Sequence, residues 1–455
     1  MPYDKFWVFG VFLVIAMWAL VLVSTSGYIV TRENVLVNTD IDLFIPTFAA
    51  MLLILVYIFL GAFIFMTYIF RIKKLGQNHL MIKEKQYQRS AIRKGSINEL
   101  CSIVVPARDE EAVIRNAVLM CLRQTYQNIE VLVIAHNSID RTYNEAKVDD
   151  KRVRSFNLKT KVSGKAIALN YGVEQSRGKY ILIIDADTVL KDDFVENAML
   201  ALDDGSYAAI QGRVFPINRG YNFVTKMMAM EDDLWQEPIM TTRTIFGERC
   251  PLLGTGFIIR KDVLVQEGMF GNALVDDYEL TCKLIRKKHR IIYLPSCEAF
   301  AEEPPSLEGL LRQRARWGKG FINCLNRKMA DLSDVIGNLL WLMPLGSFAN
   351  SVMFFVTVYA TIHYMIFEYI PYSFAYLPLQ MWFLLAGVVI GLDFIVLLKV
   401  HGLKDGLRKA VYLLPFLAFS QYGLVVCYKA LFVRGWGTTK TVHGFTTKVE
   451  TNLTK

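Results

Sequence analysis

Long apolar runs without a single charge dominate the hydrophobic pattern of this chain. Residues 6–30 and 43–70 contain no Asp, Glu, Lys or Arg. Each run is longer than the roughly 20 residues with which a helix crosses a hydrocarbon core of ~30 Å. Two further apolar runs follow at 335–367 and 377–398, the second with the single acid Asp393, and Pro344 interrupts the first of these. Because proline breaks a helix, we expect an interfacial piece before Pro344 and a crossing after it. The pattern predicts four membrane-spanning helices.

The apolar run at 410–432 has a different character. It contains Pro415, Gln421 and Lys429, and basic residues lie on both sides of it. Basic flanks at both ends are typical of a helix that lies in the membrane surface, or re-enters it, rather than one that crosses. We therefore expect an interfacial helix here, with a fifth crossing as the alternative.

The distribution of basic residues sets the expected orientation. Lys and Arg gather after the second apolar run, and short basic flanks of this kind stay in the cytoplasm. We therefore expect a multi-pass protein of the plasma membrane whose next domain is cytosolic. The predicted order is two membrane helices in 1–75, a basic cytosolic linker at 76–99, an α/β domain at 100–308, amphipathic interface helices at 309–344, two membrane helices at 345–398, and an interfacial or transmembrane helix with a cytosolic tail at 399–455.

Composition excludes several classes of protein. The chain has 455 residues with 51 Lys+Arg against 42 Asp+Glu, a net charge of +9, and 53% of its residues are hydrophobic. A chain this apolar is not intrinsically disordered. Segments facing the inner leaflet explain its positive charge, so we expect no nucleic-acid partner. The Cys residues show no CxxC spacing, which argues against a disulfide framework or a zinc site.

Alternating strand and helix patterns occur only between the two groups of apolar runs. Residues 101–107, 129–135 and 180–184 are typical of buried strands, and 109–124 has helical spacing with acids in its first turn. A strand, a helix and a strand in this order indicate a parallel sheet covered on both faces. Ligands of such sheets bind at the carboxyl ends of the strands. The domain should carry its chemistry there.

An acidic pair follows one of these strands. Asp185 and Asp187 come directly after the apolar run that ends at Ile184. Two carboxylates at i and i+2 on a strand point the same way and can grip a hard cation such as Mg²⁺ or Mn²⁺. Such an ion would neutralise a diphosphate leaving group. The alternative is a solvated turn, for which the residues Asp-Ala-Asp-Thr are equally suitable.

A second acidic pair precedes a helical pattern. Asp276 and Asp277 stand ahead of the apparent helix that begins at Leu280. Acids at this place are commonly helix caps. In a partly dry site beside another anion, however, a carboxylate gains basicity and can take a proton from a hydroxyl group.

A third group lies in the segment 310–328. Helical spacing places Gln313, Arg316 and Trp317 on one side of this helix. The guanidinium group suits a diphosphate, and the indole face suits a sugar or an apolar partner. An amphipathic helix on the membrane surface would have the same pattern, and both functions are compatible.

These three groups, in this order, resemble the family-2 glycosyltransferases, and among them the membrane-integrated processive synthases of hyaluronan, chitin, cellulose and poly-N-acetylglucosamine. The resemblance extends from about Ile103 to Lys440 and includes the paired apolar runs at the N-terminus. It implies an α/β GT-A glycosyltransferase domain inserted between α-helical transmembrane segments. The implied partners are a nucleotide-sugar donor, a carbohydrate or lipid acceptor and the lipid bilayer, and the implied cofactor is Mg²⁺ or Mn²⁺.

The resemblance also implies roles for the three groups. Asp185 and Asp187 are similar to the family's metal- and nucleotide-binding DxD motif. Asp277 is similar to the catalytic base, with Asp276 beside it on the acceptor side. The family's QxxRW motif, which binds the diphosphate and the acceptor, is matched by Gln313, Arg316 and Trp317.

Further positions resemble smaller family motifs. Lys165 is similar to a nucleotide-contacting lysine, and Gly254, Thr255 and Gly256 are similar to the loop below the acceptor sugar. Trp436, Gly437 and Thr438 are similar to the cytosolic WGT segment that closes over the nucleotide in hyaluronan synthases.

The chain departs from the family at one of its turns. Relatives have Asp-Asp-Gly-Ser after the second strand, where this chain has Ala135-His136-Asn137-Ser138. Asn137 has both a donor and an acceptor for a pyrimidine edge. We expect His136 to be an ordinary loop residue.

The implied reaction is an inverting transfer of a sugar, most often from a UDP-sugar, to the non-reducing end of a growing β-linked polysaccharide, coupled to its export. The alternative is a non-processive transferase that adds one sugar to a membrane lipid, as glucosylceramide synthases do. A non-catalytic transporter or scaffold is a third possibility, and it has no need of these three motifs in this order.

Overall fold

The computed structural model describes residues 98–202, 205–271, 273–326 and 379–433, and the isolated residues Val358, Ile362, Met365 and Ile366. The chain divides into two compact units, residues 71–341 with 426–455 and residues 1–70 with 342–425. The predicted membrane helices at 6–30 and 43–70 lie outside the described residues. So do the basic linker up to residue 97 and nearly all of the predicted helix after Pro344.

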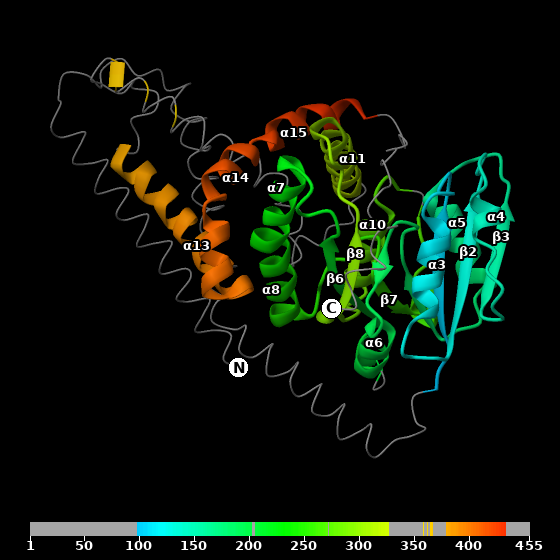
Figure 1. Ribbon diagram of the computed structural model, residues 1–455. Coiled ribbons are helices and arrows are strands. Elements are labelled where there is room, and N and C mark those ends of the chain that lie inside the picture. Colours follow the sequence, from blue (N-terminus) through cyan, green and yellow to red (C-terminus); the bar gives the residue numbers. More distant parts are fainter. Residues whose placement is uncertain are drawn as a thin grey trace. The chain divides into compact units, whose positions relative to one another are not determined.

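One mixed β-sheet forms the centre of the first unit (Figure 1). Its strands lie in the order β3-β2-β1-β4-β7-β6-β8-β5. Their bounds are β1 (Cys101–Ala107), β2 (Ile129–His136), β3 (Val153–Leu158), β4 (Tyr180–Ile183), β5 (Val189–Leu190), β6 (Ala209–Pro216), β7 (Phe257–Arg260) and β8 (Ile291–Ala301). The predicted strands at 101–107, 129–135 and 180–184 are confirmed as β1, β2 and β4.

The predicted parallel arrangement holds for only part of the sheet. Strands β1 to β4 pair in parallel, as do β6 and β8. Strand β7 runs antiparallel to both β4 and β6, and β5 runs antiparallel to β8. Since β7 is antiparallel to β4, its first residue, Phe257, pairs with Ile183 at the carboxyl end of β4. The loop before β7 therefore lies beside the end of β4, where a ligand is expected.

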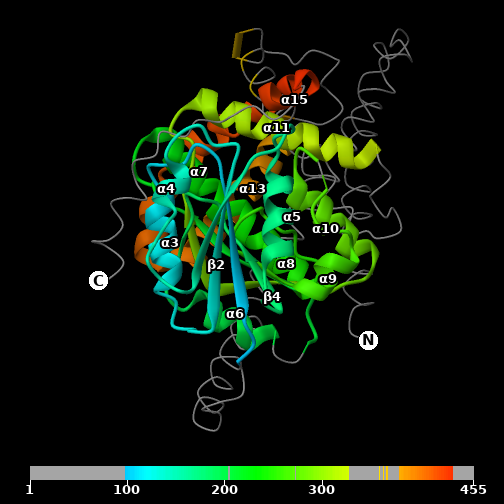
Figure 2. The same cartoon turned by 90° about the vertical axis from the view of Figure 1, so that its right-hand side faces the viewer.

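Helices cover both faces of the sheet (Figure 2). Buried side chains of α3 (Ile114–Leu122) and α6 (Phe194–Leu202) share one hydrophobic cluster with strand residues such as Ile103. On the other face, α5 (Lys165–Gln175), α9 (Lys261–Gln266) and α10 (Asp276–Arg286) share a second cluster with Val104. Neighbours such as Ile103 and Val104 serve opposite clusters because side chains alternate along a strand. The short α4 (Thr142–Glu145) follows β2.

Two longer helical segments complete this unit. One consists of α7 (Phe223–Glu231), a π-helical turn (Asp232–Gln236) and α8 (Glu237–Gly247). The other is α11 (Leu307–Asn326), which confirms the helix predicted at 310–328. A side chain at Gly318 of α11 would lie 3.3 Å from Cβ of Ala430. The last turn of α15 (Tyr422–Phe432) therefore packs closely against α11.

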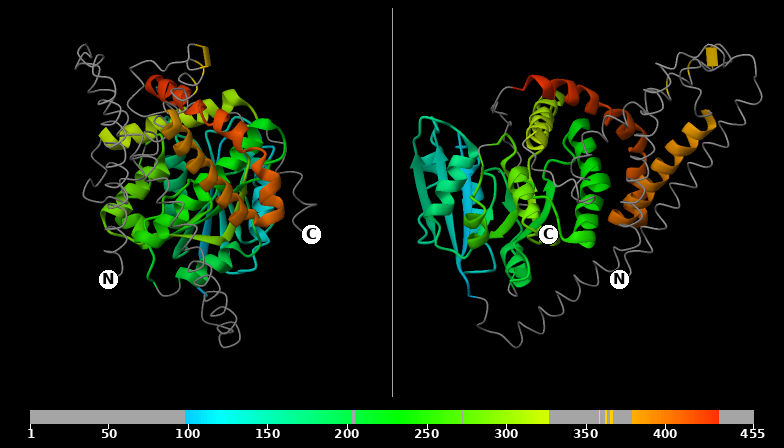
Figure 3. Two further views of the ribbon diagram at one scale, coloured as in Figure 1. Left: turned by 90° about the vertical axis from the view of Figure 1, so that its left-hand side faces the viewer. Right: turned by 180° about the vertical axis from the view of Figure 1, so that it is seen from behind.

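In the second unit, α13 (Leu379–Ala410) covers the helix predicted at 377–398 (Figure 3). Its helical path breaks at Gly402, where φ is 77°. A Cβ atom on Gly406 would lie 2.9 Å from the Leu397 carbonyl oxygen, so the chain folds back after Gly402. The predicted interfacial helix at 410–432 is instead two helices, α14 (Leu413–Phe419) and α15.

A membrane crossing needs a helix that is both long and apolar, and the described parts of the chain contain none.

Glycine at position 212 is required by the pairing of β6 with β8. A Cβ atom there would lie 2.5 Å from the Cys297 carbonyl oxygen and 2.6 Å from the Phe194 ring. The first contact is with backbone, so it is relieved only if the strands separate. We expect Gly212→Ala to lower the free energy of unfolding by about 1–3 kcal/mol, measured by thermal or urea unfolding. The control is Gly220→Ala, where no atom lies within 4 Å and the change should stay within ~0.5 kcal/mol. Equal stability of the two variants would contradict this account.

Candidate active site

Asp185 and Lys165 meet at the carboxyl end of β4. Asp185 and Asp187 lie in the turn after this strand rather than on it, so the strand argument for their common direction does not apply. Lys165 is the first residue of α5, and its Nζ lies 2.5 Å from Asp185 Oδ1. The same Nζ donates a hydrogen bond of 3.1 Å to the Gly254 carbonyl oxygen. The ammonium group thus links the acidic turn to the loop before β7.

The loop at 253–256 is shaped by two glycines with left-handed backbone angles. Gly254 has φ +79° and Gly256 has φ +62°, values that residues with a Cβ rarely adopt. Between them, Thr255 Oγ1 accepts a hydrogen bond of 2.9 Å from the Asp185 backbone N–H. The loop therefore holds the start of the acidic turn in place.

Asp277 lies directly over this loop. A Cβ atom on Gly254 would be 2.8 Å from Asp277 Oδ2 and 3.7 Å from Lys165 Nζ. Glycine is thus needed at 254 for space as well as for its backbone angle. Asp276 and Asp277 are the first two residues of α10, which corrects the prediction that they precede the helix. Acids are favourable at this end of a helix because its dipole is positive there.

Burial and neighbouring charges determine the ionisation of Asp277, Asp276 and Lys165. Burial, and then the charge of Asp276, raise the pKa of Asp277 from 3.8 to about 7, with Lys165 opposing the rise. Burial also raises the pKa of Asp276. For Lys165, burial would lower the pKa, but Asp185 and the acids of α10 raise it well above its usual value. A charged ammonium among three carboxyl groups is the result, with one of those groups poised to exchange a proton near neutral pH.

Helix α11 brings the third predicted group to the same place. Burial lowers the pKa of Arg316, and the charges of Asp277, Asp185 and Asp276 oppose that shift, which places its guanidinium within their field. One turn further along, a Cβ atom on Gly320 would lie 2.1 Å from Val275, so α11 packs directly on the residue before Asp276.

Two charged residues, Arg314 and Glu231, lie beside the indole ring of Trp317. The guanidinium carbon of Arg314 lies 4.4 Å from the centroid of the Trp317 ring, and Arg314 Nη2 lies 3.3 Å from Glu231 Oε1. Trp317 packs against the hydrophobic cluster that contains Val275. Gln313 Oε1 is buried and makes no hydrogen bond within the described residues.

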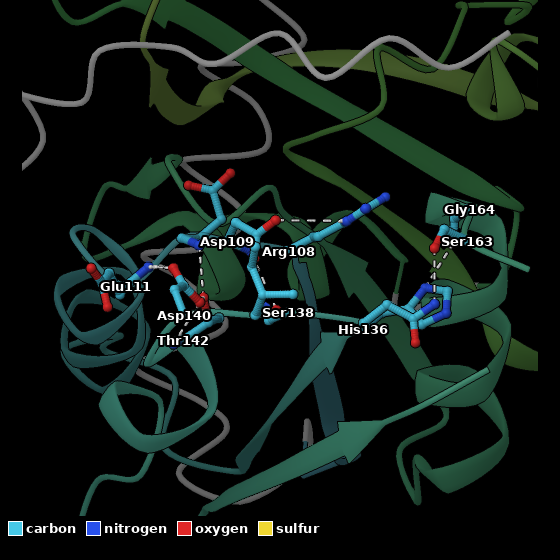
Figure 4. Close-up of polar contacts among 12 residues, drawn as sticks. Arg108, Asp109, Glu111, His136, Ser138, Asp140, Thr142, Ser163 and Gly164 are labelled. Carbon is cyan, nitrogen blue, oxygen red and sulfur yellow. Dashed lines mark hydrogen bonds and ion pairs between the residues drawn. The ribbon is translucent and has the colours of Figure 1, made fainter. Parts of the chain in front are cut away.

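His136 and Asn137 occupy the carboxyl end of β2. His136 is buried as the last residue of that strand, not a loop residue as expected. Its ring contacts the Gly164 carbonyl oxygen at 3.2 Å (Figure 4). The other ring nitrogen lies 2.7 Å from Thr160 Oγ1. Asn137 Nδ2 donates to Thr160 O and Ser163 Oγ, and its Oδ1 accepts from Thr160 N. Both residues thus hold the loop that leads into Lys165. The amide of Asn137 is engaged by this loop, and its contact with a base stays a prediction.

The neighbouring loop after β1 corrects a predicted boundary. Helix α3 begins at Ile114 and not at Asp109. The reason is that Asp109 has φ 57° and the Glu110 N–H donates to Thr142 Oγ1 at 2.7 Å. This bond to the first residue of α4 replaces a helical turn. Other members of the network are Arg108, Glu111, Ser138 and Asp140 (Figure 4).

The acidic turn provides two carboxylates for a cation. Within the described residues, no group of three or more His, Cys, Asp and Glu is placed to hold a metal ion. A Mg²⁺ ion held by few protein carboxylates takes its other ligands from a substrate diphosphate and water, and Asp185 and Asp187 would be its protein ligands here. The Asp185 side chain is 37% exposed, which leaves it open to such a substrate. Trp436, Gly437 and Thr438 lie outside the described residues.

Sequence reasoning missed one residue that organises this site. Gln211 is completely buried in β6 and hydrogen-bonds to the loop at 253–256. The available signal was a single amide side chain inside the apolar strand Ala209–Pro216, because a buried polar group needs partners.

Comparisons with known proteins extend the picture. Residues 99–320 match the sequence profile described as Glycosyltransferase like family 2. The chain is similar to the probable glycosyltransferase YdaM of Bacillus subtilis, with 25% identity over 355 residues, which cover 73% of this chain and 82% of that protein. It is also similar to the poly-beta-1,6-N-acetyl-D-glucosamine synthase of Staphylococcus epidermidis, with 26% identity over 255 residues, 53% of this chain and 60% of that protein.

Among solved structures, the mannosyltransferase PcManGT from Pyrobaculum calidifontis, in complex with GDP-Man and Mn2+, aligns over 79% of this chain and 96% of its own, with 16% identity and a TM-score of 0.46.

Proposed function

We propose that this protein is a family-2 glycosyltransferase with a GT-A-like α/β domain, and that it transfers a sugar from a UDP-sugar to the end of a growing β-linked polysaccharide. The match of residues 99–320 to the profile described as Glycosyltransferase like family 2 and the mixed sheet of this region support the proposal. The observation that carries the proposal is the position of Asp277. Its carboxylate lies over the Gly254 backbone, beside the pair of Lys165 and Asp185. A base and a cationic group at the end of β4 are the two elements that a displacement at an anomeric carbon requires.

Asp277 is the proposed general base. It accepts the proton of the acceptor hydroxyl while that oxygen forms a bond to the anomeric carbon, and the bond from this carbon to the diphosphate oxygen breaks. Attack from the face opposite the leaving group inverts the configuration, so an α-linked donor gives a β linkage. The pKa of about 7 suits this role, since a base is most effective when its pKa lies near the working pH.

Lys165 and Arg316 are the proposed partners of the departing diphosphate. Both cations are buried or half-buried next to the carboxylates, where water screens their charge little. Asp185 and Asp187 would hold a Mg²⁺ or Mn²⁺ ion. Such an ion supplies further neutralisation of the leaving group.

The choice of a polysaccharide acceptor rests on the relatives. The sequence match to the poly-beta-1,6-N-acetyl-D-glucosamine synthase extends over 255 residues, and it covers 60% of that protein. We propose that the domain is cytosolic, that the apolar runs anchor it to the plasma membrane, and that they lead the polymer outwards. Each unpaired hydroxyl group would otherwise cost kcal-scale free energy in hydrocarbon.

One assay tests the proposal directly. Purified full-length protein is incubated with each UDP-sugar and Mg²⁺ or Mn²⁺, and the product is sized before and after treatment with glycosidases of known specificity. Polymer of high molecular mass that one glycosidase degrades supports the polysaccharide synthase. A single sugar on an added lipid supports the lipid transferase instead. No transfer from any UDP-sugar would overturn the proposed function.

A further inference from the structure

A strand behind the active site carries an amide that holds the loop at 253–256 at three points. Gln211 Oε1 accepts a hydrogen bond of 2.8 Å from the Leu253 backbone N–H. Gln211 Nε2 donates to the carbonyl oxygens of Thr255 at 3.0 Å and Gly256 at 3.1 Å. One side chain therefore binds both ends of the turn that contains Gly254.

The anchoring strand β6 is paired with a neighbouring strand on each side. Gln211 pairs with Phe257 of β7 on one side and with Tyr293 of β8 on the other, and its side chain is completely buried. The backbone N–H of the adjoining Gly212 donates a hydrogen bond of 2.8 Å to the Gly256 carbonyl oxygen, which also accepts from Gln211. A loop with two left-handed glycines lacks such stiffness, because glycine leaves the backbone many conformations.

Three functional groups depend on the position of this loop. Lys165 Nζ donates to the Gly254 carbonyl oxygen, and Thr255 Oγ1 binds the Asp185 backbone. The carboxylate of Asp277 lies where a side chain of residue 254 would otherwise be. A shift of the loop would therefore move the cation, the acidic turn and the space below the base together.

The geometry points to Gln211 as the positioning residue of this site: its amide sets the floor on which the acceptor lies in line with Asp277 and the donor. This inference rests on the proposed function for the reaction itself, although the anchoring of the loop does not. Gln211 touches neither substrate, so its replacement should reduce turnover and spare nucleotide binding. A misplacement of about 1 Å costs roughly 10²-fold in rate.

Two variants and a matched control test the inference. Gln211→Leu removes both kinds of bond. Gln211→Glu keeps the acceptor for Leu253 but turns a carboxylate towards carbonyl oxygens, unless a proton restores a donor. The control is Gln124→Leu, since Gln124 is also completely buried, accepts from Val195 N and donates to Lys191 O, away from this site.

The expected results separate positioning from simple stability. Gln211→Leu should lower kcat about 10²-fold with UDP affinity unchanged within threefold, whereas Gln124→Leu should keep kcat within threefold. A buried carboxyl group has a raised pKa. The activity of Gln211→Glu relative to the wild type should therefore rise at least tenfold between pH 8 and pH 6. A kcat of Gln211→Leu within threefold of that of Gln124→Leu would overturn the inference. If Gln211→Leu does not fold, the inference is overturned when the activity of Gln211→Glu relative to the wild type stays constant between pH 8 and pH 6.

Hydrogen–deuterium exchange supplies a readout that needs no turnover. In the Gln211 variants, exchange at the loop of Leu253 should accelerate at least tenfold, and in Gln124→Leu it should not. Unchanged exchange at this loop would overturn the assignment of Gln211. A wild type that transfers no sugar would overturn the proposed function instead, and the exchange data would still decide the role of Gln211.

Discussion

Asp277→Asn should lower kcat by about 10³-fold while leaving the affinity for UDP unchanged. The amide keeps the size of the side chain but cannot accept a proton, and a positioned general base typically contributes 10² to 10⁴-fold in rate. Steady-state kinetics with saturating acceptor, together with calorimetric titration of UDP, would measure the two quantities. In the wild type, kcat should rise with pH through about 7, where Asp277 loses its proton, and this rise should vanish in the variant.

Stability provides an independent check on this variant. The pKa of Asp277 in the folded state, about 7, lies above the ordinary value of 3.8. The folded protein therefore binds more protons than the unfolded chain between these values, and stability falls as the pH rises from about 4 to about 7. Asp277→Asn removes this dependence, so it should melt no lower than the wild type at pH 8.

The matched control is Asp262→Asn. Asp262 lies in the first turn of α9, as Asp277 does in α10, but it is exposed and paired with Arg260. Its replacement should leave kcat within about twofold. If Asp277→Asn keeps near-normal turnover, or if both variants lose activity alike, Asp277 is not the base.

Lys165→Met should lower kcat about 10²-fold and move the rise of activity to higher pH. Removing one preorganised donor from a site of developing negative charge typically costs 10² to 10³-fold. Lys165 also lowers the pKa of Asp277 and of Asp276, so its loss leaves those groups protonated at a higher pH. A pH–rate profile of the variant would show both effects.

Lys261→Met is the control for this substitution. Lys261 is likewise the first residue of a helix, α9, and its Nζ donates to the Ser176 carbonyl oxygen at 2.7 Å, away from the acidic turn. We expect its pH–rate profile to match that of the wild type. A loss of activity in Lys165→Met with no shift along the pH axis would argue against an electrostatic link between Lys165 and the carboxylates.

Local patterns were sufficient for much of the fold. Apolar runs predicted β1, β2 and β4, and amphipathic spacing predicted α11, because the alternation of a strand and the turn of a helix are set by neighbouring residues. The start of α3 was wrong for a related reason. Acids at 109–111 are typical of a first helical turn, but here their backbone N–H groups bind the loop after β2.

By itself, the sequence determined which residue types carry the chemistry and where they occur along the chain: two acids after β4, two ahead of a helical pattern, and Gln313, Arg316 and Trp317 along one face of α11. Only the tertiary structure decided that Lys165 reaches Gly254, 89 positions away, and that Asp277 lies over the same glycine. The antiparallel direction of β7 makes these contacts possible, and so does the amide of Gln211 behind the loop. Strand direction and long-range hydrogen bonds depend on how distant segments pack. A local pattern of polar and apolar residues does not say which distant segment an element will pack against.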